Sequence, residues 1–284
     1  MKAVIPAAGL GSRFLPATKA QPKEMLPVVD KPAIQYIVEE ALEAGVDEVI
    51  IVNSRDKKSI EDQFSPHDAL VKHLRGVGKD TYADAVEHAG ALPVKFVYQD
   101  EPLGLGHAVH VAAHETGDDM FFVMLGDVLV PDNAMCQKMR AISEEHGGAS
   151  VIAVLPVSDD EVGRFGIIGG DDLGNGVWKV TEMVEKPALE DAPSNLASFG
   201  RYLLSPTVME LLATTEPGAG GEIQLTDALV SLLAREDMYA LVIDPSDGYD
   251  TGTVPSWIAA NVAQAMKDPK IAAYLKETVG PLFA

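Results

Sequence analysis

The N-terminal segment Ala7–Met25 groups the residues best suited to hold a phosphate. It reads AAGLGSRFLPATKAQPKEM and carries Arg13, Lys19 and Lys23 with no acidic residue among them. Glycines let backbone N–H groups approach a phosphate closely, and the basic side chains supply the opposite charge. Phe14 stands where the dinucleotide-binding fingerprint needs its third glycine, and no lysine follows in P-loop spacing. The segment therefore predicts a phosphate-binding loop and argues against a nicotinamide oxidoreductase.

Two aspartates follow candidate strands elsewhere in the chain. Asp127 comes after the apolar run of FFVMLGDV, and Asp250 lies between glycines in GYDTGT. Ligands of open α/β sheets bind beyond the carboxyl ends of the strands, and Mg²⁺ takes one or two carboxylates with phosphate oxygens and water. The pair therefore predicts a magnesium site, with a turn or helix cap as the structural alternative for Asp127.

Two polar turns complete the set of candidate site residues. The turn QDEPLGLG contains Gln99, whose amide both donates and accepts hydrogen bonds, and Gly104, which leaves room for backbone contact. The sequence VEKP places the acid Glu185 beside the base Lys186 after a candidate strand. Taken alone, the first is equally typical of a strand-to-helix turn and the second of an exposed ion pair.

Short apolar runs alternate with helical patterns through the first half of the chain. A clear helix begins near Pro32 and stops at Gly45, with apolar residues at helical spacing between them. The candidate strands are Ala3–Pro6, Glu48–Val52, Val94–Tyr98, Met120–Leu125 and Val151–Leu155. Further candidate helices are Ser59–Phe64, His107–Thr116 and Asn133–His146. This alternation predicts an α/β fold with a doubly wound, mostly parallel (Rossmann-like) sheet.

After about residue 156 the pattern changes to hairpins. Gly163–Gly170 and Val177–Glu185 flank the turn run DDLGNG and are typical of antiparallel strands. Further candidates are a strand at Leu196–Leu204, helices at Pro206–Ala213 and Thr226–Arg235, a strand at Tyr239–Ile243 and two C-terminal helical segments. We expect a single domain over residues 1–284: a core over 1–155, a small antiparallel β elaboration with the remaining core over 156–255, and a helical segment over 256–284.

Charge and composition limit the classes of function. The 284 residues carry a net charge of −21, yet residues 1–31 hold a local balance of +3 against −24 in the other 253. An acidic chain argues against nucleic-acid and anionic-membrane binding, because those partners need a positive surface. The single cysteine Cys136, the absence of a run of ~18–20 apolar residues and the lack of a signal peptide favour a cytoplasmic protein. His107, His110 and His114 share a helical face but lack a zinc motif, so we expect them to be solvated.

The N-terminal run GLGSRFLPATKAQPKEMLPVVDKP resembles the signature of the sugar-1-phosphate nucleotidyltransferases. That signature is G-x-G-[TS]-R with a proline–lysine pair about ten residues later, matched here by Arg13 and by Pro22 with Lys23. The run KEMLPVVDKPAIQY is similar to the bacterial UTP–glucose-1-phosphate uridylyltransferase branch. The resemblance implies transfer of the uridylyl group of UTP to glucose 1-phosphate by Mg²⁺-assisted in-line attack. A thymidylyltransferase, another sugar-1-phosphate nucleotidyltransferase, or a catalytically silent regulatory homologue remain the alternatives.

The same resemblance implies a role for each candidate residue. It assigns catalysis to Arg13, Lys23 and Lys186, and the metal to Asp127 and Asp250. It assigns nucleotide binding to Ala7, Ala8, Gly9, Gly11, Glu24, Gln99 and Gly104, and sugar binding to Gly166, Glu185 and Lys186. Asn195, Gly200 and Arg201 are expected to shape the sugar pocket, and GAGGEIQLTDAL to support the site. The implied partners are UTP and glucose 1-phosphate, with further copies of the chain in a dimer or tetramer, to which Ile271–Ala284 could contribute.

Overall fold

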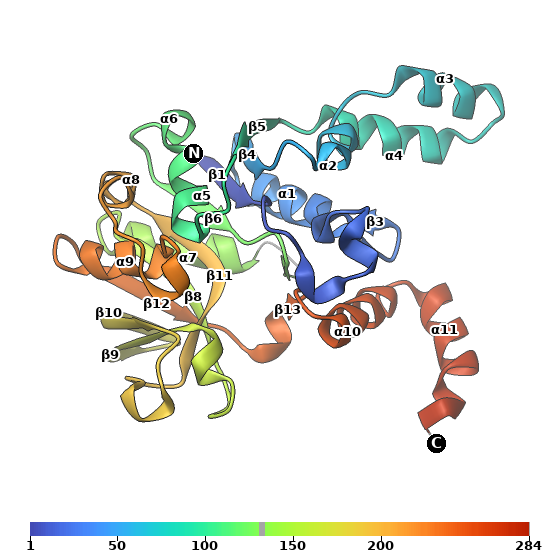
Figure 1. Ribbon diagram of the computed structural model, residues 1–284. Coiled ribbons are helices and arrows are strands. Elements are labelled where there is room, and N and C mark those ends of the chain that lie inside the picture. The colour runs from blue at the N-terminus through green and yellow to red at the C-terminus, as the bar shows by residue number, and fades with distance from the viewer. Residues whose placement is uncertain (131–133, 284) are drawn as a thin grey trace.

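A mixed sheet forms the centre of the protein, whose computed structural model describes residues 1–130 and 134–283. Its strands are β1 (Lys2–Pro6), β4 (Glu48–Asn53), β5 (Val94–Tyr98), β6 (Phe121–Met124), β8 (Ser150–Pro156), β9 (Gly166–Gly174), β10 (Val177–Glu185), β11 (Leu196–Leu204) and β12 (Met238–Val242). They lie in the order β5-β4-β1-β6-β11-β8-β12-β10-β9 (Figure 1). Every strand expected from the sequence is present, with ends that shift by three residues or fewer except at the end of β9, which extends four residues further into the turn.

The sheet is mixed rather than mostly parallel. Strands β5, β4, β1 and β6 run parallel to one another, and β8 and β12 form a second parallel pair. Strand β11 runs antiparallel between β6 and β8, and the β9–β10 hairpin pairs antiparallel with the β12 edge. An apolar run buried on both faces looks the same in either direction, so the sequence could not reveal the reversal of β11.

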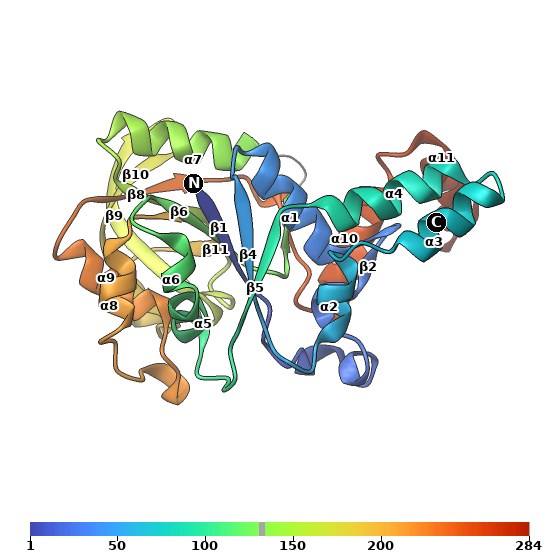
Figure 2. The same cartoon turned by 90° about the horizontal axis from the view of Figure 1, so that it is seen from above.

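Helices cover both faces of the sheet (Figure 2). One face packs against α1 (Ala33–Glu43), α7 (Ala134–Glu145) and α10 (Val254–Ala265), and the other against α5 (Leu105–Val111), α8 (Thr207–Leu212) and α9 (Leu225–Leu233). Alternation along β1 shows the division, since Ala3 and Ile5 face the first group while Val4 faces the second. The resulting α/β layers leave the strand ends open for a site.

Two helical arms project from this body. Helices α3 (Asp68–Gly76) and α4 (Asp80–Ala91) form a hairpin beyond α2 (Lys58–Gln63), and α11 (Pro269–Thr278) projects near the C-terminus (Figure 1). The sequence analysis assigned nothing to the hairpin. Leu70, Val71 and Leu74 lie at helical spacing in α3, although only Val71 among them is buried, so the sequence did carry a helical signal over this segment.

Two smaller differences concern the helices. The segment expected as one helix over His107–Thr116 is α5 followed by the short α6 (Ala113–Thr116). The expected start of α7 at Asn133 lies outside the described residues, where the described helix begins at Ala134. Over the described ranges, 1–130 and 134–283, no helix is long and apolar enough to cross a bilayer.

Candidate functional site

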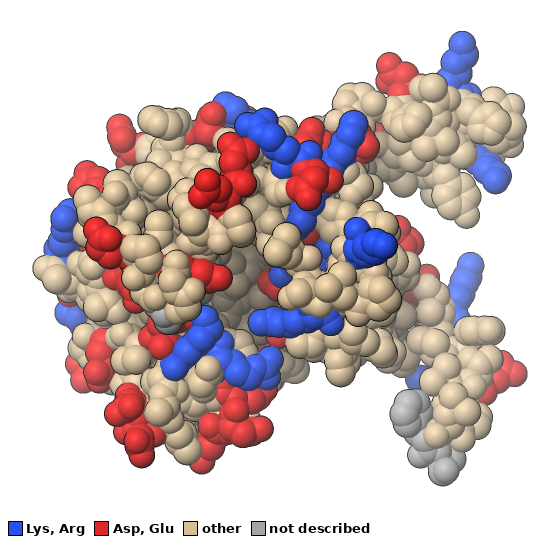
Figure 3. All heavy atoms as spheres, viewed as in Figure 1, with Lys and Arg blue, Asp and Glu red and all other residues tan. Residues whose placement is uncertain are grey.

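The glycine-rich loop leaves β1 and folds back on itself. It returns through three short 3₁₀ turns, Ser12–Phe14, Ala17–Lys19 and Lys23–Met25. Gly11 has a φ of +63°, and a β-carbon there would lie 3.2 Å from the β-carbon of Lys23. A glycine is therefore required where the loop brings Lys23 back to the carboxyl end of β1. Figure 3 shows a hollow in this face of the molecule, with Lys and Arg side chains along its edge.

Lys23 meets Asp127 in an ion pair at the sheet edge. The Lys23 Nζ lies 2.6 Å from Asp127 Oδ2, across 104 residues of sequence. Burial opposes the charged form of Lys23, but the carboxylates of Asp127 and Glu24 outweigh it and raise the lysine pKa. Asp127 follows β6, so it lies beyond the carboxyl end of a strand, as the sequence predicted.

A two-stranded ribbon brings Asp250 beside Asp127. Strand β13 (Tyr249–Asp250) pairs antiparallel with β7 (Val128–Leu129), and the Thr251 amide donates to the carbonyl of Asp127 at 2.6 Å. A β-carbon at Gly252 would lie 2.7 Å from Asp250 Oδ1, 3.0 Å from Asp127 Oδ2 and 3.4 Å from Arg13 Nη1. Arg13, Asp127 and Asp250 therefore converge on one point, although 237 residues separate the first from the last.

The paired carboxylates fit the oxygen ligands that Mg²⁺ requires. Burial raises the pKa of Asp250, and the charge of Asp127 raises it further. This is the electrostatic situation that a bound cation would relieve. Among the described residues no group of three or more histidines, cysteines or acids could hold a metal. Two carboxylates are sufficient for Mg²⁺ when phosphate oxygens and water complete its coordination.

A cavity of about 380 Å³ opens beside this cluster. Its walls include Ala8, Gly9, Lys23, Glu24, Gln99, Gly104 and Asp127. Gln99 is buried, and its Nε2 lies 3.2 Å from the Gly104 carbonyl and 2.9 Å from His107 Nδ1. His107 is therefore half-buried behind a site residue, and the expectation that it is solvated is wrong.

The turn that carries Gly104 is tied to the GAGGEIQLTDAL segment. Gly106 N donates to Ile223 O, and Ile223 N donates to Leu103 O, both at 2.8 Å. Gly104 has a φ of +110°, and a β-carbon there would lie 2.7 Å from Ile223 O. A glycine at 104 thus permits close packing of two loops, so the second segment supports the wall of the cavity.

A second cavity, of about 490 Å³, adjoins the first. Both cavities are lined by Leu125 and Asp127, and the second also by Arg13, Arg164 and Asp250. The charge of Arg164 lowers the pKa of Asp250, against the larger effect of burial. The sequence analysis did not select Arg164; its position in GRFG, two residues before Gly166, was the available signal.

Glu185 and Lys186 form a separate pair at the end of β10. The Lys186 Nζ lies 2.8 Å from Glu185 Oε1, and Thr226 Oγ1 donates to Glu185 Oε2 at 2.6 Å. Gly166 is opposite Glu185 in the β9–β10 register, and a β-carbon there would lie 3.2 Å from Glu185 Oε2. The Lys186 amide donates to the Phe165 carbonyl at 3.0 Å, beside the wall of the second cavity. The structure therefore brings together the three residues that the resemblance assigned to the sugar.

Arg201 lies beneath the segment that carries Asp127 and not in a sugar pocket. It is fully buried, with its Nε 2.9 Å from Glu40 Oε1 and its Nη2 2.7 Å from Glu40 Oε2. Its guanidinium also donates to the carbonyls of Val128 at 2.7 Å and Leu125 at 3.4 Å, which flank Asp127. The sequence analysis was right to select Arg201 but wrong about its role, because this side chain supports the segment that carries Asp127.

Lys57 was missed by the sequence analysis. Its Nζ contacts the carbonyls of Ala7 at 2.6 Å and Gly9 at 2.5 Å, and Glu24 Oε2 at 3.0 Å. Burial lowers the pKa of Lys57. Its position after β4, which is the parallel neighbour of β1, was the signal that could have selected it.

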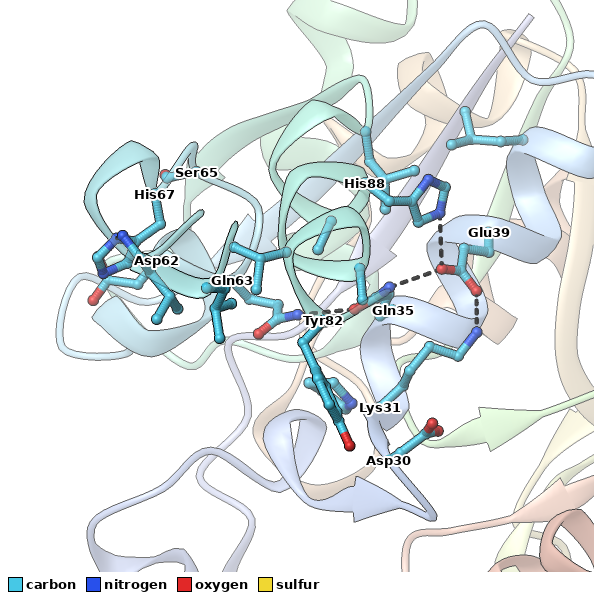
Figure 4. A pocket seen from close by; sticks show the side chains of 18 of the residues that line it. Asp30, Lys31, Gln35, Glu39, Asp62, Gln63, Ser65, His67, Tyr82 and His88 are labelled. Carbon is cyan, nitrogen blue, oxygen red and sulfur yellow. Dashed lines mark hydrogen bonds and ion pairs between the residues drawn. The ribbon is translucent and has the colours of Figure 1, made fainter. Parts of the chain in front are cut away.

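A further cavity, of about 930 Å³, lies away from these two, between α1 and the α3–α4 hairpin (Figure 4). None of the predicted site residues lines it. Its polar side chains bond to one another: Glu39 meets Lys31 at 2.5 Å, Gln35 at 2.8 Å and His88 at 3.2 Å, while Gln63 donates to Gln35. This network joins the base of the hairpin to α1.

Comparison with known proteins places this geometry in a family. The pattern of the nucleotidyl transferase family matches residues 2–267. The chain is 43% identical to the UTP–glucose-1-phosphate uridylyltransferase YngB of Bacillus subtilis, over 98% of this chain and 95% of that protein. It is 44% identical to the corresponding enzyme of Streptococcus pneumoniae, over 97% and 93% of the two chains.

Solved structures give the same result. The chain is similar to a UTP-bound UGPase from Acinetobacter baumannii, with a TM-score of 0.89, 37% identity and 98% of each chain covered. It is also similar to a UDP-glucose pyrophosphorylase complexed with UDP-glucose, with a TM-score of 0.82, 39% identity and coverage of 94% and 99%. Because these matches extend over nearly the whole sequence and fold, the chain belongs to the nucleotidyl transferase family.

Proposed function

We propose that this protein transfers the uridylyl group of UTP to glucose 1-phosphate and releases pyrophosphate. The observation that carries the proposal is the cluster of Arg13, Lys23, Asp127 and Asp250 at the junction of two adjoining cavities. One cavity offers polar groups for a nucleobase, and the pair of Glu185 and Lys186 stands near the other. The names of relatives at 43–44% identity supply the substrates.

The reaction is an in-line displacement at the α-phosphorus of UTP. A phosphate oxygen of glucose 1-phosphate forms the new P–O bond, and the bond to the β-phosphate oxygen breaks with its electron pair on pyrophosphate. Since the attacking phosphate is already ionised near neutral pH, no general base is required. The protein lowers the barrier by holding two anions in line and offsetting their charge.

The basic residues divide this work. Lys23 contacts the reacting phosphates, Arg13 stabilises charge on the departing pyrophosphate, and Lys186 holds the attacking phosphate. Mg²⁺, when held by Asp127 and Asp250, supplies further positive charge beside the polyphosphate. The Lys23 ammonium now neutralises Asp127, so we expect it to exchange partners when phosphates arrive.

The remaining residues orient the two substrates. The loop residues Ala7, Ala8, Gly9 and Gly11 would face the nucleotide. Glu24, Gln99 and Gly104 form the base end of the smaller cavity, and Gln99 offers both donor and acceptor capacity to a uracil edge. Gly166 and Glu185 would receive the sugar, with Glu185 accepting hydrogen bonds from its hydroxyl groups. This assignment treats residues 1–155 as the nucleotide core and 156–255 as the sugar elaboration.

We also propose that the chain self-associates as a dimer or tetramer. Helix α10 exposes Val254, Ile258, Val262 and Met266 at four-residue spacing, each 39–50% accessible. Such an apolar stripe is typical of a surface that another protein covers. Light scattering on the intact protein, compared with Ile258→Glu, would test whether this stripe joins two copies.

A pyrophosphate-release assay across four nucleoside triphosphates and several sugar 1-phosphates tests the function. We expect UTP with glucose 1-phosphate to give the highest kcat/KM. A higher kcat/KM with dTTP would identify a thymidylyltransferase instead. No release with any pair would contradict an enzymatic role and favour a silent regulatory homologue.

A further inference from the structure

We propose that Lys57 is a positioning residue of the nucleotide site: its ammonium orients two peptide groups of the glycine-rich loop and holds Glu24 at the cavity wall. The inference rests on the proposed function, because it concerns how the nucleotide is received. No site role was assigned to Lys57 from the sequence. The contacts of this side chain join the segment after β4 to both the start and the end of the Ala7–Met25 loop.

The three N–H donors of the ammonium face three acceptors. These are the carbonyls of Ala7 at 2.6 Å and Gly9 at 2.5 Å, and Glu24 Oε2 at 3.0 Å. The Lys57 side chain is only 11% exposed and that of Glu24 is fully buried. A charge-assisted contact at such a depth is stronger than an exposed ion pair and is poorly replaced by water.

The two carbonyl contacts determine where the loop amides point. In a planar trans peptide the C=O and N–H groups point to opposite sides. Since the carbonyls of Ala7 and Gly9 face Lys57, the amides of Ala8 and Leu10 point away from it. Neither amide donates a hydrogen bond to a residue that the structure describes, and both residues line the smaller cavity. The loop therefore presents two unused donors on the side from which an anionic nucleotide arrives.

The contact between Lys57 and Glu24 uses one oxygen of the Glu24 carboxylate and leaves the other oxygen available to a ligand. Glu24 Oε1 is buried and has no hydrogen-bond partner among the described residues, while Oε2 is held by Lys57. Burial raises the pKa of Glu24, and the charges of Lys57 and Lys23 act against that rise. Lys57 thus stabilises the carboxylate form, whose second oxygen can accept from an N–H group such as that of a uracil ring.

The next residue provides a matched control. Lys58 has the same side chain and begins α2, but it is 74% exposed and pairs with Asp62 one helical turn along α2. Removing the charge of Lys58 changes the net charge equally without touching the loop or the cavity. Any difference between the two variants therefore reports the three contacts of Lys57.

The test compares Lys57→Met with Lys58→Met in the full-length protein. We expect Lys57→Met to raise the Kd for UTP, measured by calorimetry without the sugar phosphate, about tenfold or more. Its KM for UTP should rise in parallel while its KM for glucose 1-phosphate stays within about twofold, and Lys58→Met should leave both unchanged. Lys57→Arg, which keeps a cation, should recover part of the lost affinity.

The outcomes distinguish a failure of the positioning role from a failure of the proposed function. Equal UTP affinity in Lys57→Met and Lys58→Met would overturn the positioning role, as would an equal rise in both Michaelis constants. If Lys57→Met unfolds, Glu24→Gln supplies the measurement, because it removes the carboxylate that Lys57 holds; unchanged UTP affinity in Glu24→Gln would also overturn the positioning role. A wild-type protein that neither binds UTP nor forms UDP-glucose would refute the proposed function itself.

Discussion

The two charged clusters of the site are built in opposite ways. Arg13, Lys23, Asp127 and Asp250 come from three distant parts of the chain and meet within a few ångströms of Gly252. Glu185 and Lys186 are neighbours in sequence at the end of one hairpin strand, and the Lys186 side chain is 47% exposed. We call the first the phosphate cluster and the second the sugar pair.

The difference shows what each cluster needs from the rest of the protein. The phosphate cluster depends on buried contacts beneath it, since Arg201 donates to the carbonyls of Leu125 and Val128 and is itself held by the Glu40 carboxylate. Cys136 belongs to the same buried network, where its thiol contacts Glu40 at 3.4 Å. The sugar pair needs only its hairpin and Thr226. A substitution in the buried support of the phosphate cluster should therefore destabilise the whole fold, whereas a substitution in the sugar pair should have only a local effect.

The largest effect should come from Arg201→Met. This substitution leaves the Glu40 carboxylate buried without its cation, so the free energy of unfolding should fall by about 3–5 kcal/mol. Urea unfolding followed by circular dichroism measures the change. Lys179→Met is the control, because it breaks an exposed pair with Asp237 and should lose at most about 1 kcal/mol. Equal urea midpoints for Arg201→Met and Lys179→Met would show that the buried pair stabilises the fold no more than an exposed pair does.

Asp127→Asn tests the phosphate cluster without removing its volume. We expect kcat to fall about 10²–10³-fold because the metal and Lys23 lose a full negative charge, while the fold stays intact. Pyrophosphate release at saturating Mg²⁺ gives kcat, and Asp119→Asn at an exposed position is the control. Near wild-type turnover in Asp127→Asn would show that this carboxylate is not part of the reacting site.

Lys186→Ala tests the sugar pair. The KM for glucose 1-phosphate should rise about tenfold, the scale of one charge-assisted hydrogen bond, while the KM for UTP and the melting temperature stay close to wild type. Lys179→Ala, near the other end of the same strand, controls for loss of a lysine from β10. An unchanged KM for glucose 1-phosphate would contradict the assignment.

The smallest effect concerns stability at Asp250. Burial and Asp127 raise the pKa of this carboxyl, so its ionised form destabilises the folded state at neutral pH. Without metal, Asp250→Asn should therefore unfold at slightly higher temperature, with a gain of up to about 1 kcal/mol, although its turnover falls. The gain should vanish as the pH is lowered until Asp250 is protonated in the wild type. Mg²⁺ should stabilise the wild type more than the variant; the reverse order would refute Asp250 as a ligand.

Much of the fold followed from local patterns. The strands Val94–Tyr98, Val177–Glu185 and Leu196–Leu204 have the ends that the sequence predicted, because each is a compact run bounded by turns. The direction of β11 was not predictable in this way, because strand direction depends on the connection through space. Helix α3 has Leu70, Val71 and Leu74 at helical spacing, so local pattern could have indicated the helix but not its packing as a projecting hairpin.

The sequence by itself determined the chemical types at the site and their order along the chain. The glycines, Arg13, Lys23, the two aspartates and the acid–base pair were all recognisable from residue type and position after a strand. Only the tertiary structure decided which of these groups meet; it added Lys57 and Arg164, and it placed Arg201 in a buried pair with Glu40 instead of the expected sugar pocket. The reason is physical: a charge acts over a few ångströms, and the neighbours within that range are chosen by strand order and burial rather than by separation in sequence.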